Sequence, residues 1–254
     1  RVARSYRLHM SDFSGMRVLE RWYERLDADE LIEQISSKKW KKLVRKQIAK
    51  ETARTAVEHD FPKLAHMRDG RARIKDDPPL IFHPTGAGTK EYEQMIQSAF
   101  RRYCATLGDD RRALLEHFAI KDVALKVVGV GSVGTYCAIL LMMAGNDDPL
   151  FLQVKEARTS VLEAYAGKSD YRNRGQRVVN GQRLMQAASD LFLGWTTSGS
   201  GRHFYVRQLR DVKISPVIEI MSPKSMDTFA EACGWALARA HAKSGDSSMI
   251  AGYL

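Results

Sequence analysis

The spacing of apolar residues changes twice along the chain, and each change predicts a different kind of structure. Before residue 119, apolar residues recur at helical spacing. The clearest such helix ends near Gly108, and its apolar face carries Tyr92, Ile96, Phe100, Tyr103 and Leu107. Short apolar runs typical of strands follow, together with a helix at 176–188. We therefore expect an α+β protein with a mostly helical part at 1–118, a glycine-loop antiparallel sheet with one helix at 119–213, and a helical part at 214–254.

Local signals predict further features of these parts. Ser11 and Asp12 are residue types that begin helices, so a helix is predicted to start there. A turn is predicted at 194–201, where glycine, serine and threonine cluster. His83 has no second ligand at metal spacing, and a surface or structural role is expected for it.

A basic helix is predicted from Lys38 to about Val57. Its first run, Lys38–Lys46, is interpreted as a solvated helix face, with a surface for phosphates or nucleic acid as the alternative. Nucleic acid is not the favoured partner, because no aromatic stacking series and no known nucleic-acid motif accompanies the run.

A glycine-rich loop lies at the centre of the strand-rich part. It has the form G-x-G-x-x-G, with Gly129, Gly131 and Gly134 at the glycine positions and Ser132 between them. Glycines at this spacing let backbone N–H groups approach phosphate oxygens, because no Cβ stands in the way. Three apolar runs flank the loop and the turn after it: Val123–Val128, Tyr136–Met142 and Leu150–Lys155.

Two kinds of nucleotide site use such a loop, and the residues after it separate them. In a dinucleotide-binding βαβ unit the loop opens a helix, and an acid about 20 residues on binds the ribose; Glu156 is the candidate. In a kinase-like small lobe the loop joins two antiparallel strands, and a lysine on the third strand binds the phosphates; Lys155 is the candidate. Strand formers after the loop and a turn at 145–149 favour the hairpin, although 140–144 also suits a helix. In the third run Gln153 and Lys155 alternate with apolar residues, which predicts a half-buried strand.

Composition excludes some classes of protein. Hydrophobic residues make up 44% of the chain and charged residues 28%, as in ordinary globular proteins. No apolar run approaches the roughly 20 residues that span a membrane, so no membrane association is expected. The 3 cysteines are far apart, which favours reduced thiols and a cytoplasmic location. The net charge of +10 suits nucleic acid, anionic lipid or a polyanionic small molecule, and it also suits solubility alone.

Five segments resemble the bacterial "domain of unknown function 2252" family: Lys126–Thr135, Phe151–Ala157, Gly181–Asp190, Tyr205–Asp211 and Ala238–Asp246. That family resembles the kinase-like superfamily that includes aminoglycoside phosphotransferases. The resemblance implies a circularly permuted kinase-like fold, in which the catalytic-loop and metal-loop segments precede this chain. The chain would then be part of a longer protein and would lack the general base and the ligands for Mg²⁺. The segment His241–Asp246 resembles a catalytic-loop motif, but three residues between His241 and Gly245 break the pattern. The segment is therefore interpreted as a helix end.

The resemblance also implies roles for individual residues in binding ATP. The loop would cover the phosphates, Lys155 would neutralise phosphate charge, and the segment after the last strand would link the lobes and meet the adenine edge. The nucleotide-binding residues expected on this basis are Gly129, Gly131, Ser132, Gly134, Lys155, Arg207, Gln208 and Leu209.

The partner of Lys155 is a departure from the kinase-like pattern. Kinase-like lobes pair this lysine with a glutamate from the next helix. Asn180 occupies the position where that acid is expected, and an amide carries no charge. Either Glu163 or Glu156 substitutes for it, or the pairing is weak, or the helix has a different register.

Three functions remain open. The first is a phosphotransferase, in the complete protein, that uses ATP and acts on an unknown phosphoryl acceptor. The second is a non-catalytic, pseudokinase-like module that binds nucleotide. The third is an NAD(P)-binding oxidoreductase of Rossmann type, which requires a helix directly after the glycine loop.

Overall fold

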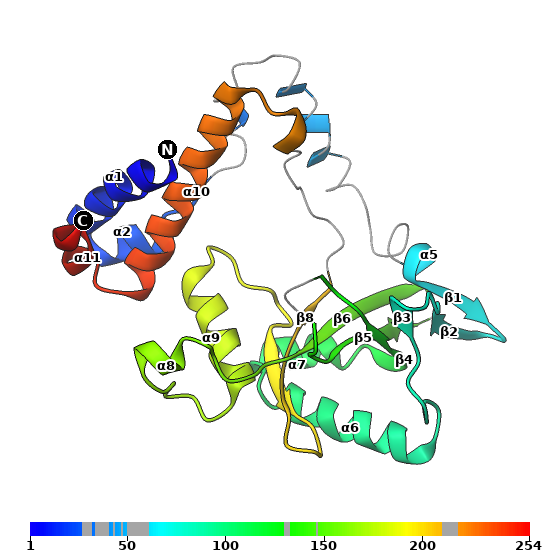
Figure 1. The fold of residues 1–254 in the computed structure, drawn as a ribbon. Coiled ribbons are helices and arrows are strands. Elements are labelled where there is room, and N and C mark those ends of the chain that lie inside the picture. Colours follow the sequence, from blue (N-terminus) through cyan, green and yellow to red (C-terminus); the bar gives the residue numbers. More distant parts are fainter. Residues whose placement is uncertain are drawn as a thin grey trace. The chain divides into compact units, whose positions relative to one another are not determined.

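The computed structural model describes residues 1–26, 32–33, 41–42, 44–46, 48–49, 61–129, 133–145, 147–209 and 218–254. Most of the predicted basic helix, including Lys38, lies outside these ranges. The chain forms two compact units (Figure 1). The first unit comprises Arg1–Ala53, Gly181–Ser189 and Val212–Leu254, and the second comprises Arg54–Asn180 and Asp190–Asp211. The division of the sequence at 118/119 and 213/214 stays a prediction.

A six-stranded sheet forms the centre of the second unit (Figure 1). In spatial order its strands are β3 (Ile81–Phe82), β4 (Ala119–Lys126), β5 (Cys137–Ala144), β6 (Asp148–Glu156), β8 (His203–Gln208) and β7 (Gly194–Thr197). Every neighbouring pair is antiparallel. The α+β class is therefore confirmed, with helices near both chain ends and an antiparallel sheet between them.

The glycine-rich loop joins two antiparallel strands of this sheet. β4 pairs with β5 along most of its length, and the loop connects them. The predicted hairpin is therefore confirmed, and the helix alternative for 140–144 is wrong. The run suits a helix in sequence because β5 is buried on both faces: Leu140 and Met142 belong to one apolar cluster, and Ile139 and Leu141 belong to another. A strand buried on both faces loses the alternation that marks a half-exposed strand.

β6 is more deeply buried than the half-buried strand that the sequence predicted. Its residues 149–153 are buried, and the Gln153 side chain is among them at 4% exposure. The face that was expected to meet solvent is covered by α5 (Phe61–Leu64) and by the hairpin of β1 (Ala65–Arg68) and β2 (Arg71–Ile74). This cover comes from a distant part of the sequence, so the pattern within the strand did not reveal it.

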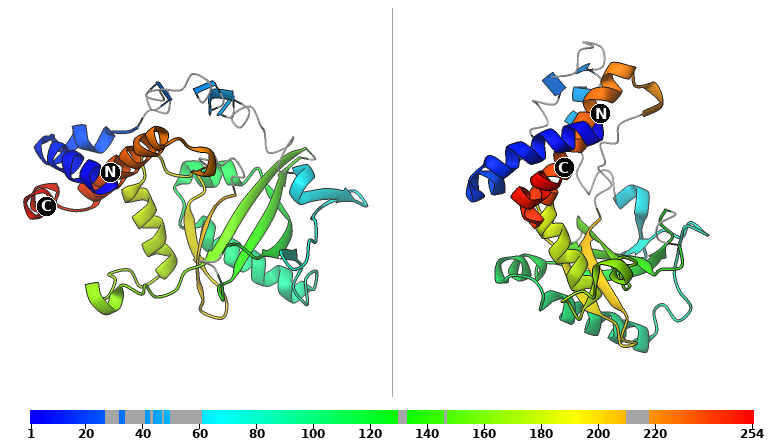
Figure 2. Two further views of the ribbon diagram at one scale, coloured as in Figure 1. Left: turned by 45° about the horizontal axis from the view of Figure 1, so that its top comes forward. Right: turned by 60° about the vertical axis from the view of Figure 1, so that its left-hand side comes forward.

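The other face of the sheet packs against α6 (Lys90–Cys104) and α7 (Asp109–Leu115). Figures 1 and 2 show α6 running along this face. Tyr103 and Leu107 are buried in the shared cluster, and the other predicted apolar positions of the helix pack against it. Thr89 caps the helix, because its Oγ1 accepts a hydrogen bond from the Tyr92 N–H at 3.3 Å. The predicted helix and its apolar face are confirmed.

The turn predicted at 194–201 is a strand in its first half, so that prediction is wrong there. β7 pairs with β8 from Gly194 to Thr197. Gly194 resembles a turn residue in sequence, but it is needed for close packing: a Cβ there would lie 2.8 Å from both Thr106 Oγ1 and Tyr103 Cε2. A glycine within a strand often marks such a close approach.

Two helices lie between β6 and β7, namely α8 (Glu163–Ala166) and α9 (Arg174–Met185). The predicted helix at 176–188 is confirmed, with both ends slightly earlier in the chain. Near its start Gly175 lies against β8, where a Cβ would be 2.2 Å from the carbonyl oxygen of Phe204. Only glycine allows this approach of helix to strand.

The first unit contains α1 (Val2–Gly15), α2 (Val18–Tyr23), the 3₁₀ turn η3 (Ile218–Ile220), α10 (Pro223–Ser244) and α11 (Ser247–Tyr253). α1 packs on α10 so closely that a Cβ on Gly234 would lie 2.5 Å from Val2 O. Met10 and Phe13 are buried in the cluster between these helices. Ser11 and Asp12, where a helix was predicted to start, lie inside α1, which starts at Val2, so that boundary is wrong. Packing against α10, which lies far away in sequence, defines α1 more strongly than the local capping signal.

The segment His241–Asp246 is the end of one helix and the start of the next. α10 stops at Ser244, and Asp246 caps α11 by accepting hydrogen bonds from the N–H groups of Ser248 at 2.9 Å and Met249 at 3.0 Å. The helix-end interpretation is confirmed. α10 has 22 residues, yet in the described part of the chain no helix is both long and apolar enough to cross a membrane.

Candidate functional site

The returning half of the glycine loop is fixed to the end of β6. The Tyr136 N–H donates to Glu156 Oε2 at 3.0 Å, and the Glu156 N–H donates to Tyr136 O at 2.8 Å. Arg158 donates a hydrogen bond to the carbonyl of Gly134, whose φ of 74° lies in the left-handed region that favours glycine. Gly129 is also described, whereas Gly131 and Ser132 lie outside the described residues.

Lys155 lies at this same end of the sheet. The strand register places it opposite Cys137 on β5 and opposite Tyr205 on β8. Directly opposed residues share a face of the sheet, so the three side chains form a row across β5, β6 and β8. Burial raises the pKa of the Cys137 thiol, and the nearby positive charge of Lys155 opposes that rise. A half-buried ammonium group thus lies beside the strand that leaves the glycine loop.

Next to Lys155 a buried polar network crosses the sheet. Gln153 Oε1 accepts hydrogen bonds from Arg207 Nε at 3.1 Å and Nη2 at 3.0 Å. Gln153 Nε2 donates to Cys137 Sγ at 3.6 Å. Sequence reasoning singled out Arg207 and missed the role of Gln153. The available signal was a polar residue within an otherwise apolar strand.

The proposed adenine segment uses two of its backbone donors within the protein. The Gln208 N–H donates to Asp190 Oδ2 at 2.7 Å. The Leu209 N–H donates to Phe151 O at 2.8 Å, and its side chain packs against the apolar cluster of the β1–β2 hairpin. An adenine edge at this segment would therefore meet carbonyl groups or displace one of these bonds.

A basic cavity of about 600 Å³ lies at the end of β6, and sequence reasoning missed it. Arg158, Arg174 and Arg202 line it, and Arg202 also lies over the Tyr136 ring at 4.4 Å from the centroid. Burial and the charge of Arg174 lower the pKa of His203 in its wall. Glu156 also lines this cavity. Its side chain points to the opposite face of the sheet from that of Lys155, because successive strand residues alternate. The arginines come from separate segments, so no local run of charge marked them.

The family described as "Uncharacterized protein conserved in bacteria (DUF2252)" matches residues 1–254. The chain belongs to this family. No curated protein and no solved structure matches this DUF2252 chain.

The three candidate partners of Lys155 lie in different places in the DUF2252 chain. Glu163 on α8 forms an ion pair with Arg177 of α9, with 3.5 Å between Oε1 and Nη1. Asn180 lies on α9, next to a fully buried valine. Glu156 accepts a hydrogen bond from Arg158 Nε at 3.3 Å in addition to its bond with Tyr136. Burial works against the charged form of Glu156, but these bonds and the arginine charge outweigh it and lower its pKa. Glu156 and Glu163 thus both have arginine partners.

Metal binding was expected to depend on residues outside this chain. Among the residues that the structure describes, no group of three or more His, Cys, Asp and Glu side chains could hold a metal ion. The ligands for Mg²⁺ stay a prediction for the complete protein.

Proposed function

We propose that the glycine hairpin and Lys155 bind the phosphates of ATP, and that the complete protein is a phosphotransferase. The observation that carries this proposal is the register of β5 and β6. It sets Lys155 opposite Cys137, the first residue of the strand that leaves the glycine loop. In kinase-like proteins a glycine-rich loop covers the phosphates and a lysine from the third strand binds them. The order of strand, loop, strand and lysine-bearing strand is the same here.

The proposed roles follow from the chemistry of the groups. Backbone N–H groups of the loop donate to phosphate oxygens, and the Lys155 ammonium supplies a positive charge beside them. Catalysis of phosphoryl transfer depends mainly on positioning and on electrostatic stabilisation. This chain would supply nucleotide binding, whereas the general base and the ligands for Mg²⁺ would come from elsewhere in the complete protein. The phosphoryl acceptor is a further partner, of unknown chemistry.

Two observations bear on the alternative functions. An NAD(P)-binding unit needs a helix after the loop and parallel strands around it, so the antiparallel strands β4 and β5 favour the kinase-like proposal. A non-catalytic nucleotide-binding module is the second candidate. It is favoured by Asn180, because an amide at the position of the expected glutamate cannot form a charged pair with Lys155.

The proposal is tested by the affinity of the complete protein for ATP. We expect Lys155→Ala to bind ATP at least about tenfold more weakly, since one charge-assisted hydrogen bond is lost. Lys168→Ala is the matched control, because Lys168 is exposed on the loop after α8. Equal affinity of wild type and Lys155→Ala would remove Lys155 from the site.

Two further measurements distinguish the three functions. Turnover of ATP that depends on Mg²⁺ would separate the phosphotransferase from the binding module. Retention of NAD in place of ATP would favour the oxidoreductase.

A further inference from the structure

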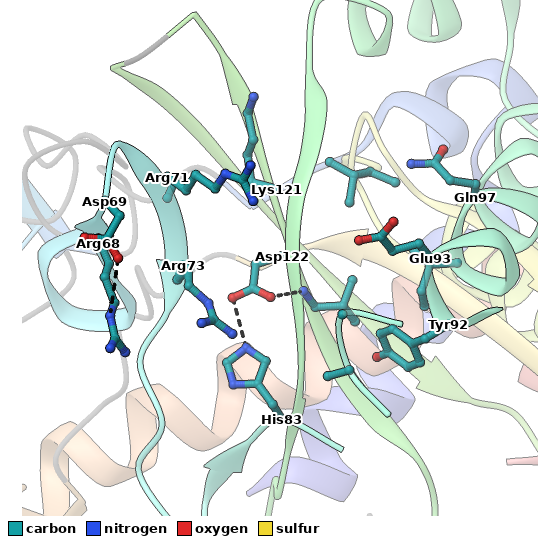
Figure 3. A pocket seen from close by; sticks show the side chains of 16 residues that line it. Arg68, Asp69, Arg71, Arg73, His83, Tyr92, Glu93, Gln97, Lys121 and Asp122 are labelled. Atoms are coloured by element: carbon teal, nitrogen blue, oxygen red, sulfur yellow. Dashed lines mark hydrogen bonds and ion pairs between the residues drawn. The ribbon is translucent and has the colours of Figure 1, made fainter. Parts of the chain in front are cut away.

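A cavity of about 980 Å³ opens along one edge of β4, toward the end of the strand that is farther from the glycine loop (Figure 3). β3 pairs with β4 only at Leu125 and Lys126, so residues 119–124 have no strand partner on that side within the described ranges. The walls are β2 on one side of this edge and α6 on the other. All of the lining residues belong to the second unit.

The wall formed by β2 and β4 carries three basic side chains. Arg71 and Arg73 share the outer face of β2, because the alternate residues Ala72 and Ile74 are buried. Lys121 is the extra residue of a β-bulge, at which Ile120 and Asp122 pair with successive residues of β5. A bulge redirects a side chain away from the regular face of a sheet, and here it brings Lys121 to the cavity beside Arg71 (Figure 3).

None of these three cations is held in an ion pair within the described residues, although the charge of Arg73 helps to lower the pKa of Asp76. In the described part of the chain, no hydrogen bond or ion pair joins the side chain of Arg71, Arg73 or Lys121 to another residue. Arg68, by contrast, forms an ion pair with Asp69 at 3.9 Å. Unpaired arginines that converge on a cavity are well suited to bind an anion from solution.

Asp122, a carboxylate of the same cavity, already accepts hydrogen bonds on both oxygens. Asp122 Oδ2 accepts hydrogen bonds from the Ile74 N–H at 2.8 Å and from His83 Nε2 at 2.9 Å. Its Oδ1 accepts one from the Val123 N–H at 2.9 Å. With these bonds Asp122 is compensated within the protein, and its charge opposes an incoming anion less than a free carboxylate would.

His83 supplies the compensating charge. Its Nδ1 lies 2.8 Å from Asp76 Oδ1 while its Nε2 bonds to Asp122, so both ring nitrogens face carboxylates. Both must then carry protons, which makes the ring an imidazolium. Burial opposes that charge, but the bonds to Asp122 and Asp76 outweigh burial and raise the pKa of His83. The imidazolium joins the chain before β3 to β4 and fixes the base of the cavity.

The opposite wall has a different character. Glu93 and Gln97 extend from α6 toward the cavity, and Tyr92 lies beside them (Figure 3). A carboxylate and an amide accept hydrogen bonds from hydroxyl or amino groups. The cavity is therefore basic on the strand wall and hydrogen-bond-accepting on the helix wall, which suits a ligand with an anionic end and a hydroxylated or amino end.

We propose that this cavity binds a phosphorylated small molecule, with its phosphate among Arg71, Arg73 and Lys121 and its hydroxyl or amino groups against Glu93 and Gln97. Guanidinium groups bind phosphate oxygens in a fixed fork, and lysine adds a point charge. The volume lies at the upper end of the range for small-molecule sites, about 300–1,000 Å³. The site stands apart from the proposed ATP site, because Lys155 is not among its lining residues.

The test is a titration of the protein with inorganic phosphate and with glucose 6-phosphate, followed through backbone amide signals in NMR spectra. We expect saturable shifts of the amide signals of Arg71, Arg73 and Lys121 with both probes, with tighter binding of glucose 6-phosphate. Arg73→Gln and Lys121→Gln should each weaken binding about tenfold. Glu93→Gln should weaken the binding of glucose 6-phosphate but not that of phosphate.

Matched controls separate a specific site from general attraction to a basic protein. Arg172→Gln and Lys168→Gln remove exposed charges outside the cavity and should leave both affinities unchanged. Equal weakening by control and cavity variants, or no saturable shift up to about 10 mM of either probe, would overturn the proposal. In Lys155→Ala the shifts of the Arg71, Arg73 and Lys121 amide signals should persist with both probes, and their loss would show that the cavity is not a separate site. Far-ultraviolet circular dichroism of every variant confirms that each one is folded.

Discussion

Gln153 neutralises none of the positive charge of Arg207, although it accepts two hydrogen bonds from that side chain. An amide satisfies the geometry of the guanidinium fork and leaves its charge in place. The face of β5, β6 and β8 near the glycine loop therefore carries the charges of both Lys155 and Arg207. Such a face is suited to an anionic ligand, which agrees with the proposed site for ATP phosphates.

Substitution of Gln153 should expose how far this pair stabilises the sheet. We expect Gln153→Leu to lower the free energy of unfolding by about 1–3 kcal/mol, because the half-buried guanidinium of Arg207 loses its acceptor. The double variant Gln153→Leu with Arg207→Leu should lose less than the sum of the single losses. Urea unfolding measures both, and exposed Gln94→Leu, expected within about 0.5 kcal/mol of wild type, is the control. Additive losses would show that the two residues do not act together.

The contact of α9 with β8 predicts opposite effects for two glycines of one helix. Gly175→Ala should destabilise the protein by about 1–3 kcal/mol, since its Cβ would lie 2.2 Å from Phe204 O and the backbone must shift. Gly181→Ala should stabilise it by about 0.5–1 kcal/mol, because a Cβ there meets nothing within 4 Å and alanine favours a helix. Thermal unfolding of the two variants checks the signs. A stabilised Gly175→Ala variant would mean that α9 does not lie this close to β8.

The packing of α1 on α10 makes a parallel prediction for the first unit. Gly234→Ala should lower stability by about 1–3 kcal/mol, because its Cβ would lie 2.5 Å from Val2 O and 2.6 Å from Ser5 Cβ. Gly252→Ala, on α11, meets nothing within 4 Å and should not destabilise the protein. Urea unfolding followed by far-ultraviolet circular dichroism compares the two variants. Equal behaviour of both variants would contradict the close approach.

The link from Asp76 through His83 to Asp122 predicts a dependence of stability on pH. The pKa of His83 is raised in the folded protein, so its contribution is complete below the unfolded value of about 6.5 and is lost as pH rises through the folded pKa. The charged groups that face it are Asp76 and Asp122, with Arg73 close to Asp76. We expect the difference in unfolding free energy between wild type and His83→Gln to shrink from about pH 6 to about pH 9. Exposed His117→Gln serves as the reference, and a difference that does not change with pH would refute the imidazolium.

Where local patterns agreed with tertiary packing, the sequence predicted the fold well. The apolar face of α6 could be predicted because helical spacing and burial coincide from Tyr92 to Leu107. The hairpin at the glycine loop could be predicted from the strand formers after it. β7 could not, because Gly194 serves a close contact with Tyr103 and resembles a turn residue in sequence.

In the candidate sites, too, residues close in sequence could be predicted to act together, whereas residues joined only by tertiary packing could not. Lys155 could be located at a strand end beside the loop, since both are close in sequence. The bond between His83 and Asp122 joins residues 39 positions apart, and no local pattern connects them. Arg71 and Arg73 alternate along β2, but Lys121 is distant in sequence, and only the approach of β2 to the edge of β4 brings it beside them.

The reciprocal bonds between Tyr136 and Glu156 have a consequence for ligand affinity. Because they fix the returning end of the glycine loop to the strand of Lys155, a phosphate that binds there finds part of its site preorganised. Fewer backbone torsions have to become ordered on binding, and less of the interaction free energy is lost to entropy. The strength of such a site would then depend on a carboxylate that never touches the ligand.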